Sequence, residues 1–445
     1  MKKKILTLLL IISTLISSFI YTNPVQAANS SNSKKSSMPK PDFTIESEGA
    51  ILIDSNTGTV LYGKNENDKL YPASTTKILT AILAIENCKL TDKITASYNA
   101  VMSIPSGYSN AAIQPGETLT MKELLDMFLI HSANEIGNIF AEHISGSIEN
   151  FAVLMNKKAL EIGCKNTHFT NPSGIHDPEH YSTTYDMALI TKYCMKNQIF
   201  RDTVAKTSCK IQATDKYQER YFRNTNDLLN SSTEYYYEHA IGVKTGYTSQ
   251  SKRCLISASL KNNLELITVV LGAQTADARY HDTINLFEYG YSNYKIQQIA
   301  YKNSLVDEII IGNATKDTQN LPILIKNDVA GIVPSNLDLN NLDYSIKLND
   351  LIVAPIEQGA IIGKITYNID DFDYSSDLIA GHSVEEFKPL VLLGQIALAI
   401  FVLFILGKLL LPKKKSKKRI SKKKKSGKKK HKNYKKCSDS IYKFN

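Results

Sequence analysis

Cysteine is scarce in this sequence, which has six in 445 residues. None belongs to a C-x-x-C pair, and the six positions are Cys88, Cys164, Cys194, Cys209, Cys254 and Cys437. Cys437 lies in a lysine-rich tail, and the odd number that remains, at irregular spacing, excludes a disulfide framework. Most of these thiols are therefore expected to be small apolar residues inside a core.

Acidic residues are missing from most of the C-terminal tail: Lys413 to Lys436 contain sixteen Lys or Arg and no Asp or Glu. The whole chain has a formal net charge of +10. The positive charges of this tail and of three N-terminal lysines together exceed that value. The remainder, residues 28–411, carries a net charge of about −9. The chain is basic only at its ends, and we expect no nucleic-acid partner.

Hydrophobic runs near both ends indicate an exported, anchored protein. Residues 1–27 combine three lysines, a long apolar stretch and small residues before Ala28, which predicts a signal peptide. Residues 28–43 are polar without apolar periodicity and predict a flexible tether. Residues 389–412 are long and apolar enough for one transmembrane anchor.

The lysine cluster after this anchor predicts its orientation. Lysines beside a spanning helix mark the cytoplasmic side, so residues 413–445 are predicted to be a basic cytoplasmic tail. Such a tail would contact anionic membrane lipids. The folded part would then lie on the extracytoplasmic face of the cell membrane, held by a single-pass anchor.

The part between the two ends has no useful internal repeat. Its pattern changes near residue 303, from mixed helices and strands to short β runs. Residues 44–302 begin with a predicted hairpin that turns at Asn56 to Gly58 and end with two adjacent strands, "CLISASL" and "LELITVVLGA". Between and after them the apolar periodicity predicts helices: Ser74–Asn87, Met121–His131, Asn134–Ile144, Ile148–Ile162 and Ala276–Tyr291. This order favours one sheet with helices packed over it.

Residues 303–385 consist of short β runs separated by turn residues and predict a small all-β domain. The runs include "VDEIIIG", "LPILIK", "GIVP", "YSIKLN", "LIVAPI" and "AIIGKITYNI". No nucleophile, base and orienting group cluster here, so we expect a spacer or docking role. The polar stretch "DFDYSSDLIAGHSVEEFKP" is interpreted as the connection to the membrane.

The segment "LYPASTTKILTAILAIEN" places Ser74 three residues before Lys77 at the start of an apolar helix. Three residues are close to one turn, so both side chains project from the same face, near enough to exchange a proton. Helix starts commonly carry a capping serine, so the pattern alone is weak. In this setting it is also the geometry of an activated nucleophile.

Two further segments supply groups that such a nucleophile needs. In "FLIHSANEIGNIF" an apolar helix stops at His131 and leaves Ser132 and Asn134 in a tight connection. In "IGVKTGYT" Lys244 and Thr245 suit a carboxylate, and Gly246 lets a ligand approach the strand edge. Each motif alone is usually a cap or a turn.

Together, S-x-x-K, S-x-N and K-T-G in this order are the set found in penicillin-binding proteins and related β-lactamases. The chain resembles the D-alanyl-D-alanine carboxypeptidases, which are low-molecular-mass penicillin-binding serine peptidases, from about Ile45 to the membrane segment. The stretches "NTHFTNPSGI", "HYSTTYDMA" and "GVKTGYT" share in this likeness. The resemblance implies an α/β (α+β) catalytic domain with a mainly antiparallel sheet flanked by helices, and a β-rich second domain.

The resemblance also implies roles for the first two motifs. Ser74 would be the acylating nucleophile, and Lys77 its general base, kept neutral by burial and by a nearby cation such as Lys244. Ser132 would relay the proton to the leaving D-alanine. Asn134 would hold Lys77 and the substrate amide.

Binding roles follow for the third motif and for one helix. Lys244 and Thr245 would bind the terminal carboxylate beside Gly246, and the N–H groups of Ser74 and Tyr247 would form the oxyanion hole, helped by the helix dipole. Arg279 lies where the family places a carboxylate-binding arginine. The alternative for Arg279 is a helix-surface ion pair with a neighbouring acid, Asp277 or Asp282.

The implied substrates are peptidoglycan pentapeptide stems, β-lactam antibiotics would be covalent inhibitors, and no metal or cofactor is expected. Two features depart from the family: Gln250 to Arg253 replace the small residues that often follow K-T-G, and a spanning helix replaces an amphipathic anchor. The first affects the groove edge, and the second affects attachment and leaves the chemistry unchanged.

Several alternatives stay open. A β-lactamase of the same fold would need a positioned water, and no E-x-x-L-N segment is visible near "DLLN" at Asp227. A D,D-endopeptidase or a non-catalytic cell-wall binding protein would keep the fold. "HDPEH", His176 to His180, matches a zinc-peptidase signature, but Pro178 would break the helix that presents the ligands, so we expect a surface loop.

Overall fold

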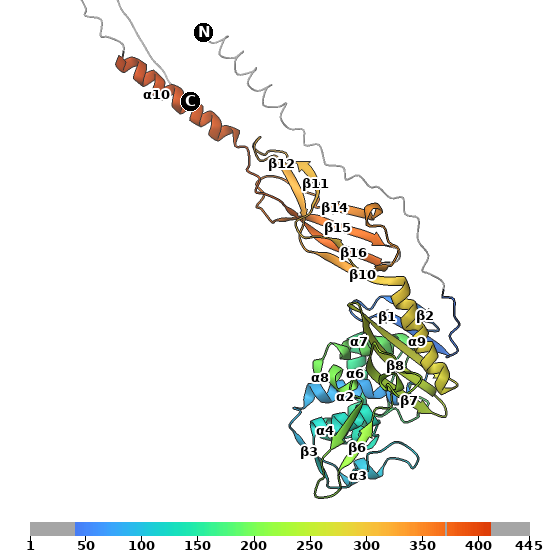
Figure 1. Ribbon diagram of the computed structural model, residues 1–445. Helices are drawn as coiled ribbons and strands as arrows, with labels where there is room; N and C mark the ends of the chain where they lie inside the picture. Colours follow the sequence, from blue (N-terminus) through green and yellow to red (C-terminus); the bar gives the residue numbers. More distant parts are fainter. Residues whose placement is uncertain (1–40, 370–371, 411–445) are drawn as a thin grey trace, which may run out of the picture. The chain divides into compact units, whose positions relative to one another are not determined.

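The computed structural model describes residues 41–369 and 372–410, drawn as coloured ribbon in Figure 1. The predicted signal peptide (1–27), residues 28–40 of the predicted tether and the predicted basic tail (413–445) lie outside the described residues. Helices and strands alternate up to residue 300, and strands dominate from there to residue 380. This arrangement confirms the predicted fold class, a mixed α/β part followed by an all-β part.

A five-stranded sheet forms the centre of the mixed part. The strands are β1 (Gly49–Asp54), β2 (Val60–Lys64), β7 (Ala240–Thr248), β8 (Lys252–Lys261) and β9 (Leu264–Ala273). Their order is β2–β1–β9–β8–β7, and every neighbouring pair is antiparallel. The predicted hairpin and the predicted strand pair therefore join in one sheet.

Successive residues of these strands face two different apolar cores, because strand side chains alternate between faces. Ile51 and Ile53 belong to a large core shared with most of the helices. Ala50 and Leu52 belong to a second core against α9 (Ala276–Asn293). Figure 1 shows α9, in yellow, on one side of the strands, and α2, α6 and α7 on the other.

The helices of the large core are α2 (Lys77–Asn87), α3 (Tyr98–Met102), α4 (Met121–Asp126), α5 (Glu135–Ser145), α6 (Ile148–Ile162), α7 (Thr184–Met195) and α8 (Gln198–Val204). Helix α6 has its predicted bounds and ends at Gly163, whose φ of +107° is left-handed. Four of the five described cysteines, at positions 164, 194, 209 and 254, are buried and free, as expected for apolar residues.

Three helices differ from their predicted form near the functional motifs. The one predicted to begin at Ser74 starts as a 3-10 turn, Ala73–Thr76, before α2. The one predicted to end at His131 widens into a π-helix, η3 (Met127–His131), after α4. Asn134 is the N-cap of α5 and precedes its first turn.

Two small antiparallel strand pairs were not anticipated from the sequence. β3 (Lys93–Thr95) pairs with β4 (Thr118–Thr120), and β5 (Ser208–Ile211) pairs with β6 (Arg220–Arg223). These strands have only three or four residues, which is too short for a clear period-2 pattern.

The all-β part contains a second five-stranded sheet, ordered β11–β12–β16–β15–β14. Its strands are β11 (Leu305–Ile310), β12 (Asn320–Ile325), β14 (Asp343–Leu348), β15 (Ile361–Ile369) and β16 (Phe372–Ala380). Strand β10 (Tyr294–Ala300), which precedes residue 303, pairs with β13 (Val329–Pro334).

Two sequence interpretations in this part were wrong. The stretch read as a connection to the membrane contains β16, which pairs with both β12 and β15. Three consecutive polar residues, Ser375 to Asp377, hid the strand, because the buried position 376 carries a serine and interrupts the apolar alternation. Conversely, "LIVAPI" is not a strand, and only Ile356 forms an isolated bridge, to Val384. Pro355 cannot donate a ladder hydrogen bond.

Residues from 386 onward form a separate unit, of which helix α10 (Pro389–Leu410) is described. It has 22 residues and a mean hydropathy of 2.8, so its length and composition fit a membrane span.

Candidate active site

Ser74 and Lys77 lie where the 3-10 turn passes into helix α2. Their spacing places both side chains on one side of the turn, and Lys77 Nζ lies 2.9 Å from Ser74 Oγ. Ala73 has a left-handed φ of +48°, which is strained for alanine. Gly174 packs against this turn so closely that a Cβ there would lie 1.8 Å from the carbonyl oxygen of Ala73.

Lys77 is fully buried, and its amine contacts three oxygen atoms. These are Ser74 Oγ at 2.9 Å, Asn134 Oδ1 at 2.8 Å and the carbonyl oxygen of Ser173 at 2.8 Å. Among the described residues, no carboxylate forms an ion pair with this amine. Burial lowers the pKa of Lys77 well below its usual range, the positive charge of Lys244 lowers it further, and Glu135 opposes both effects.

The three contacts define how a neutral Lys77 would be oriented. Asn134 Oδ1 and the Ser173 carbonyl can only accept, so they take the two N–H bonds of the amine. The orientation of the Asn134 amide is fixed because its Nδ2 donates to the carbonyl oxygen of Ser109 at 2.8 Å. The amine lone pair then faces Ser74 Oγ, which is the one contact that can donate a hydrogen.

Ser132 and Asn134 occupy the tight connection between η3 and α5. Ser132 ends the π-helix with a left-handed φ of +70°, and Asn134 caps α5. In this short connection, Asn134 Oδ1 accepts a hydrogen bond from Lys77 Nζ at 2.8 Å. The Ser132 side chain is buried and forms no hydrogen bond with another described residue.

The K-T-G motif lies within β7, the edge strand of the central sheet. Lys244 is buried, and its Nζ donates to the carbonyl oxygen of Thr245 at 3.1 Å. Thr245 Oγ1 lies 2.6 Å from Thr225 Oγ1. A Cβ at Gly246 would lie 3.1 Å from the backbone nitrogen of Ser74, so glycine permits the strand to approach Ser74.

Arg279 projects from α9 and is only 8% exposed. Its Nη2 donates to Tyr280 Oη at 3.0 Å, and its guanidinium lies 4.6 Å from the centre of the Tyr280 ring. Burial lowers the pKa of Lys244 to about 7, and the positive charge of Arg279 contributes to this shift. Two buried cations that influence each other make a site that favours an anion.

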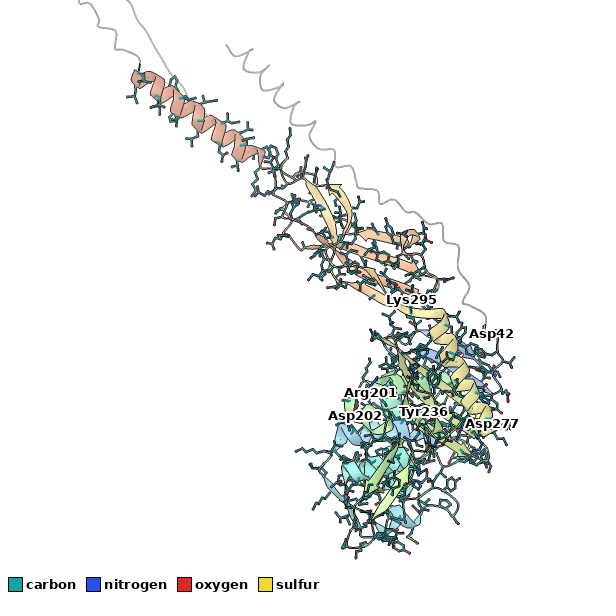
Figure 2. All side chains as sticks on the ribbon, in the orientation of Figure 1. Asp42, Arg201, Asp202, Tyr236, Asp277 and Lys295 are labelled. Carbon is teal, nitrogen blue, oxygen red and sulfur yellow. The ribbon has the colours of Figure 1, made fainter. Side chains whose placement is uncertain are left out.

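The two acids considered as partners of Arg279 are engaged elsewhere. Asp282 accepts the backbone N–H of Ser47 at 2.9 Å and its hydroxyl at 2.6 Å. Asp277 accepts a hydrogen bond from the Tyr235 hydroxyl, and Figure 2 labels Asp277 near the start of α9. Within the described chain, neither acid forms an ion pair with Arg279, so a surface ion pair does not explain this arginine.

Tyr247 differs from the other predicted residues because its side chain is 57% exposed. The guanidinium of Arg253 lies 5.0 Å from its ring centre, across the β7–β8 pair. The predicted role of Tyr247 concerns its backbone N–H, which follows Gly246 along the edge strand. The departure at Gln250 to Arg253 thus contacts Tyr247 through Arg253.

The segment 171–180 contributes two groups to which the sequence assigned no role. The carbonyl oxygen of Ser173 accepts from Lys77, and His180 Nε2 lies 2.8 Å from Thr76 Oγ1. Nδ1 of His180 accepts the backbone N–H of Thr170 at 3.1 Å, so Nε2 carries the hydrogen. A backbone acceptor leaves no signal in side-chain chemistry, which explains the omission of Ser173.

The "HDPEH" segment is irregular, as Pro178 predicted, and Pro178 and Glu179 are exposed. The expectation of a surface loop is wrong for His180, which is 2% exposed, and burial lowers its pKa to about 3. No group of three or more His, Cys, Asp or Glu within residues 41–369 and 372–410 is placed to hold a metal ion.

Comparison with known proteins assigns both parts of the chain. Residues 32–275 match the family of D-alanyl-D-alanine carboxypeptidases, peptidase family S11, and residues 294–386 match the C-terminal domain of penicillin-binding protein 5. D-alanyl-D-alanine carboxypeptidase DacF of Bacillus subtilis is 34% identical over 349 residues, covering 77% of this chain and 87% of the relative.

Solved structures give the same result. Penicillin-binding protein 5 from Haemophilus influenzae aligns with a TM-score of 0.65 and 26% identity, over 78% of this chain and all of that structure. The Streptomyces K15 DD-transpeptidase aligns with a TM-score of 0.52 and 30% identity, over 56% of this chain and 98% of that structure.

Proposed function

The chain belongs to the family of D-alanyl-D-alanine carboxypeptidases, and we propose that its reaction passes through an acyl-enzyme on Ser74. The observation that carries this proposal is the buried amine of Lys77, which lies 2.9 Å from Ser74 Oγ and has two pure acceptors as its other partners. Burial and the positive charge of Lys244 favour the neutral, basic form of this lysine, and serine needs a base to become a nucleophile.

In the acylation step, Ser74 Oγ attacks the carbonyl carbon of the penultimate D-alanine while its proton passes to Lys77 Nζ. The developing oxyanion accepts hydrogen bonds from the backbone N–H groups of Ser74 and Tyr247. The close approach of Gly246 to Ser74 supports this assignment, because it brings the edge strand beside the nucleophile. The Ser74 turn at the start of α2 adds a favourable dipole.

Collapse of this intermediate breaks the peptide C–N bond, and the leaving nitrogen of D-alanine must gain a proton. Ser132 is assigned as the relay that passes this proton from Lys77 to the amine. Its hydroxyl has no partner among the described residues and is free to bridge the two nitrogens. Water then attacks the ester carbonyl and gives a proton to Lys77. The acyl C–O bond breaks, Lys77 returns this proton to Ser74 Oγ, and the shortened peptide leaves with a free carboxylate.

Residues of the K-T-G motif and of α9 would recognise the substrate. Lys244, Thr245 and Arg279 would bind the free terminal carboxylate. An exopeptidase must bind this group in preference to an internal peptide bond. Asn134 would hold the substrate amide as well as Lys77. We propose peptidoglycan pentapeptide stems as substrates and β-lactams as covalent inhibitors of Ser74, because both present a carboxylate and a reactive carbonyl.

A synthetic pentapeptide that ends in D-alanyl-D-alanine tests this proposal. The expected product is the tetrapeptide plus free D-alanine, measured by mass spectrometry, and penicillin should add its full mass to the protein in a long-lived adduct. Ser74→Ala should remove both results while its thermal midpoint stays close to that of the parent. Product formation by Ser74→Ala would disprove the assignment of the nucleophile.

The same experiment separates the alternatives. Rapid turnover of penicillin would indicate a β-lactamase, and cleavage of cross-linked dimers in preference to pentapeptides would indicate a D,D-endopeptidase. No product and no adduct would indicate a non-catalytic wall-binding protein. The presence of Ser74, Lys77, Ser132 and Lys244 favours the enzyme.

For the whole chain we propose a membrane-anchored enzyme: a signal peptide (1–27), a tether (28–43), a catalytic domain (44–302), a β-rich spacer (303–385), an anchor (389–412) and a cytoplasmic tail (413–445). The apolar character of α10 and the basic tail support this topology. Protease added to intact protoplasts should remove the catalytic domain and spare the tail. Loss of the tail instead would show the opposite orientation.

A further inference from the structure

The orientation of Asn134 depends on a loop that has no regular structure. The backbone N–H and the side-chain Nδ2 of Asn134 both donate to the carbonyl oxygen of Ser109, at 2.9 and 2.8 Å. Ser109 lies in the stretch 103–117, between α3 and β4, where no residue is helical or in a strand. The amide that orients Lys77 is therefore only as well placed as this loop.

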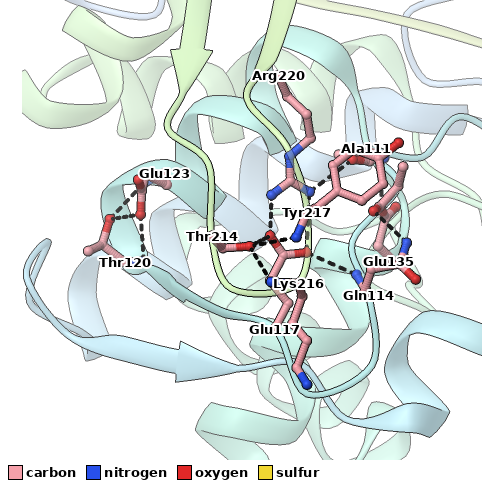
Figure 3. Close-up of polar contacts among 11 residues, drawn as sticks. Ala111, Gln114, Glu117, Thr120, Glu123, Glu135, Thr214, Lys216, Tyr217 and Arg220 are labelled. Atoms are coloured by element: carbon pink, nitrogen blue, oxygen red, sulfur yellow. Dashed lines mark hydrogen bonds and ion pairs between the residues drawn. The ribbon is translucent and has the colours of Figure 1, made fainter.

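Side chains from outside the loop hold its middle in place. The backbone N–H of Ala111 donates to Glu135 Oε1 at 2.6 Å, and its carbonyl oxygen accepts from Arg220 Nη1 at 3.3 Å. The next residue, Ala112, has a left-handed φ of +55°, which is unfavourable for alanine without such support. Figure 3 shows Ala111 between Glu135 and Arg220.

The second anchor is a buried ion pair between the loop and the β5–β6 hairpin. Glu117 and Arg220 have side chains that are 0% and 5% exposed, and both guanidinium Nη atoms donate to the carboxylate. The carboxylate also accepts from the backbone N–H of Gln114 at 3.0 Å and from Thr214 Oγ1 at 2.9 Å. Figure 3 shows these groups converging on Glu117.

We propose that Glu117 and Arg220 are positioning residues for the reaction. Together they hold the 103–117 loop so that the Ser109 carbonyl orients Asn134, and Asn134 in turn orients the amine of Lys77. Neither side chain touches the nucleophile or its base. Because a misplacement of about 1 Å can cost a reaction about a hundredfold, distant support of this kind has a measurable effect on rate.

The proposal rests on the proposed acyl-enzyme function and is tested by a double-mutant cycle of Glu117→Gln with Asn134→Ala. The rate constant for acylation of Ser74 by a fluorescent penicillin is measured for the full-length protein in detergent. Glu117→Gln should slow acylation by about tenfold in the parent and less than about twofold in Asn134→Ala, because the effect passes through Asn134. The fall in thermal midpoint should be the same in both backgrounds.

An equal loss of rate in both backgrounds would overturn the proposal, since Glu117 would then act on stability alone. If Glu117→Gln does not fold, Thr214→Ala removes one donor and keeps the ion pair, and it should show the same pattern with about a threefold loss. Equal losses in its two backgrounds would overturn the proposal just as clearly.

A matched control lies on the same hairpin. Lys210 and Glu219 form an ion pair at 2.9 Å whose side chains are 53% and 51% exposed, so Lys210→Gln should leave acylation unchanged. A slowing as large as that of Glu117→Gln would mean that any change in the hairpin has this effect. Failure of the parent protein to be acylated would instead refute the proposed function and is distinguishable from an additive cycle.

Discussion

The candidate active site contains two buried lysines, Lys77 and Lys244, whose surroundings differ. Lys77 is surrounded by three oxygen atoms within 2.9 Å, so its hydrogen-bonding capacity is filled by the protein. Lys244 makes one hydrogen bond, at 3.1 Å, and experiences the positive charge of Arg279. Burial lowers the pKa of both amines.

This difference indicates what each lysine is built to do. A filled set of acceptors fixes the direction of the Lys77 lone pair, which is what proton transfer to and from one oxygen requires. The amine of Lys244 makes one hydrogen bond among the described residues, so its other N–H groups can donate to an anionic ligand, which the positive charge of Arg279 would also attract. In the proposed mechanism, the same residue type would thus serve proton transfer at Lys77 and substrate recognition at Lys244.

The largest expected effect separates the two lysines by rate. Lys77→Met should slow acylation by penicillin about a thousandfold or more, because the general base is lost while the volume is kept. Lys244→Met should mainly raise KM for peptides with a free carboxylate, by about tenfold. Stopped-flow acylation and steady-state kinetics measure these quantities. Equal effects of the two substitutions on acylation would remove the distinction.

Arg279→Gln tests whether the surroundings of Lys244 bind the terminal carboxylate of the substrate. It should lower kcat/KM for free-acid D-alanyl-D-alanine peptides by about tenfold, since a charged hydrogen bond contributes about 1.5–3 kcal/mol. A substrate with an amidated C-terminus should be affected far less. Equal losses on both substrates would mean that Arg279 supports the fold and does not bind the carboxylate.

The pH dependence tests whether Arg279 acts on Lys244. Lys244 has a pKa of about 7 and must be charged to bind a carboxylate, so kcat/KM for free-acid peptides should fall severalfold as pH rises above that value. In Arg279→Gln this decline should move to higher pH, because one cause of the lowered pKa is gone. If kcat/KM declined at the same pH in Arg279→Gln as in the parent, burial alone would account for the lowered pKa of Lys244.

The smallest expected effect concerns stability. Lys77→Met leaves Asn134 Oδ1 and the Ser173 carbonyl without a donor, whereas Lys244→Met leaves only the Thr245 carbonyl. Lys77→Met should therefore lower the free energy of unfolding by about 1–3 kcal/mol more than Lys244→Met. Urea denaturation at neutral pH measures both values, and the reverse order would contradict the account of the filled acceptor set.

Much of the site was predictable because its residues lie in short motifs with local geometry. The spacing of Ser74 and Lys77 on one turn required only helical periodicity, and it agrees with the 2.9 Å contact. The strand alternation and turn residues likewise predicted the hairpin and the strand pair of the central sheet. The β16 strand was missed because Ser375, Ser376 and Asp377 interrupt its apolar alternation, and the buried position 376 carries a polar side chain.

What the sequence determined by itself is the list of reactive groups, the hairpin, strand pair and motif-bearing helices of the mixed part, and a C-terminal segment apolar enough to span a membrane. Only the tertiary structure decided which groups meet. Several of these contacts join residues far apart in the sequence. Ser173 and Lys77 are 96 positions apart, His180 and Thr76 are 104 apart, and Arg220 and Glu117 are 103 apart. Such contacts leave no local periodicity, because they form only when packing closes the long loops between them.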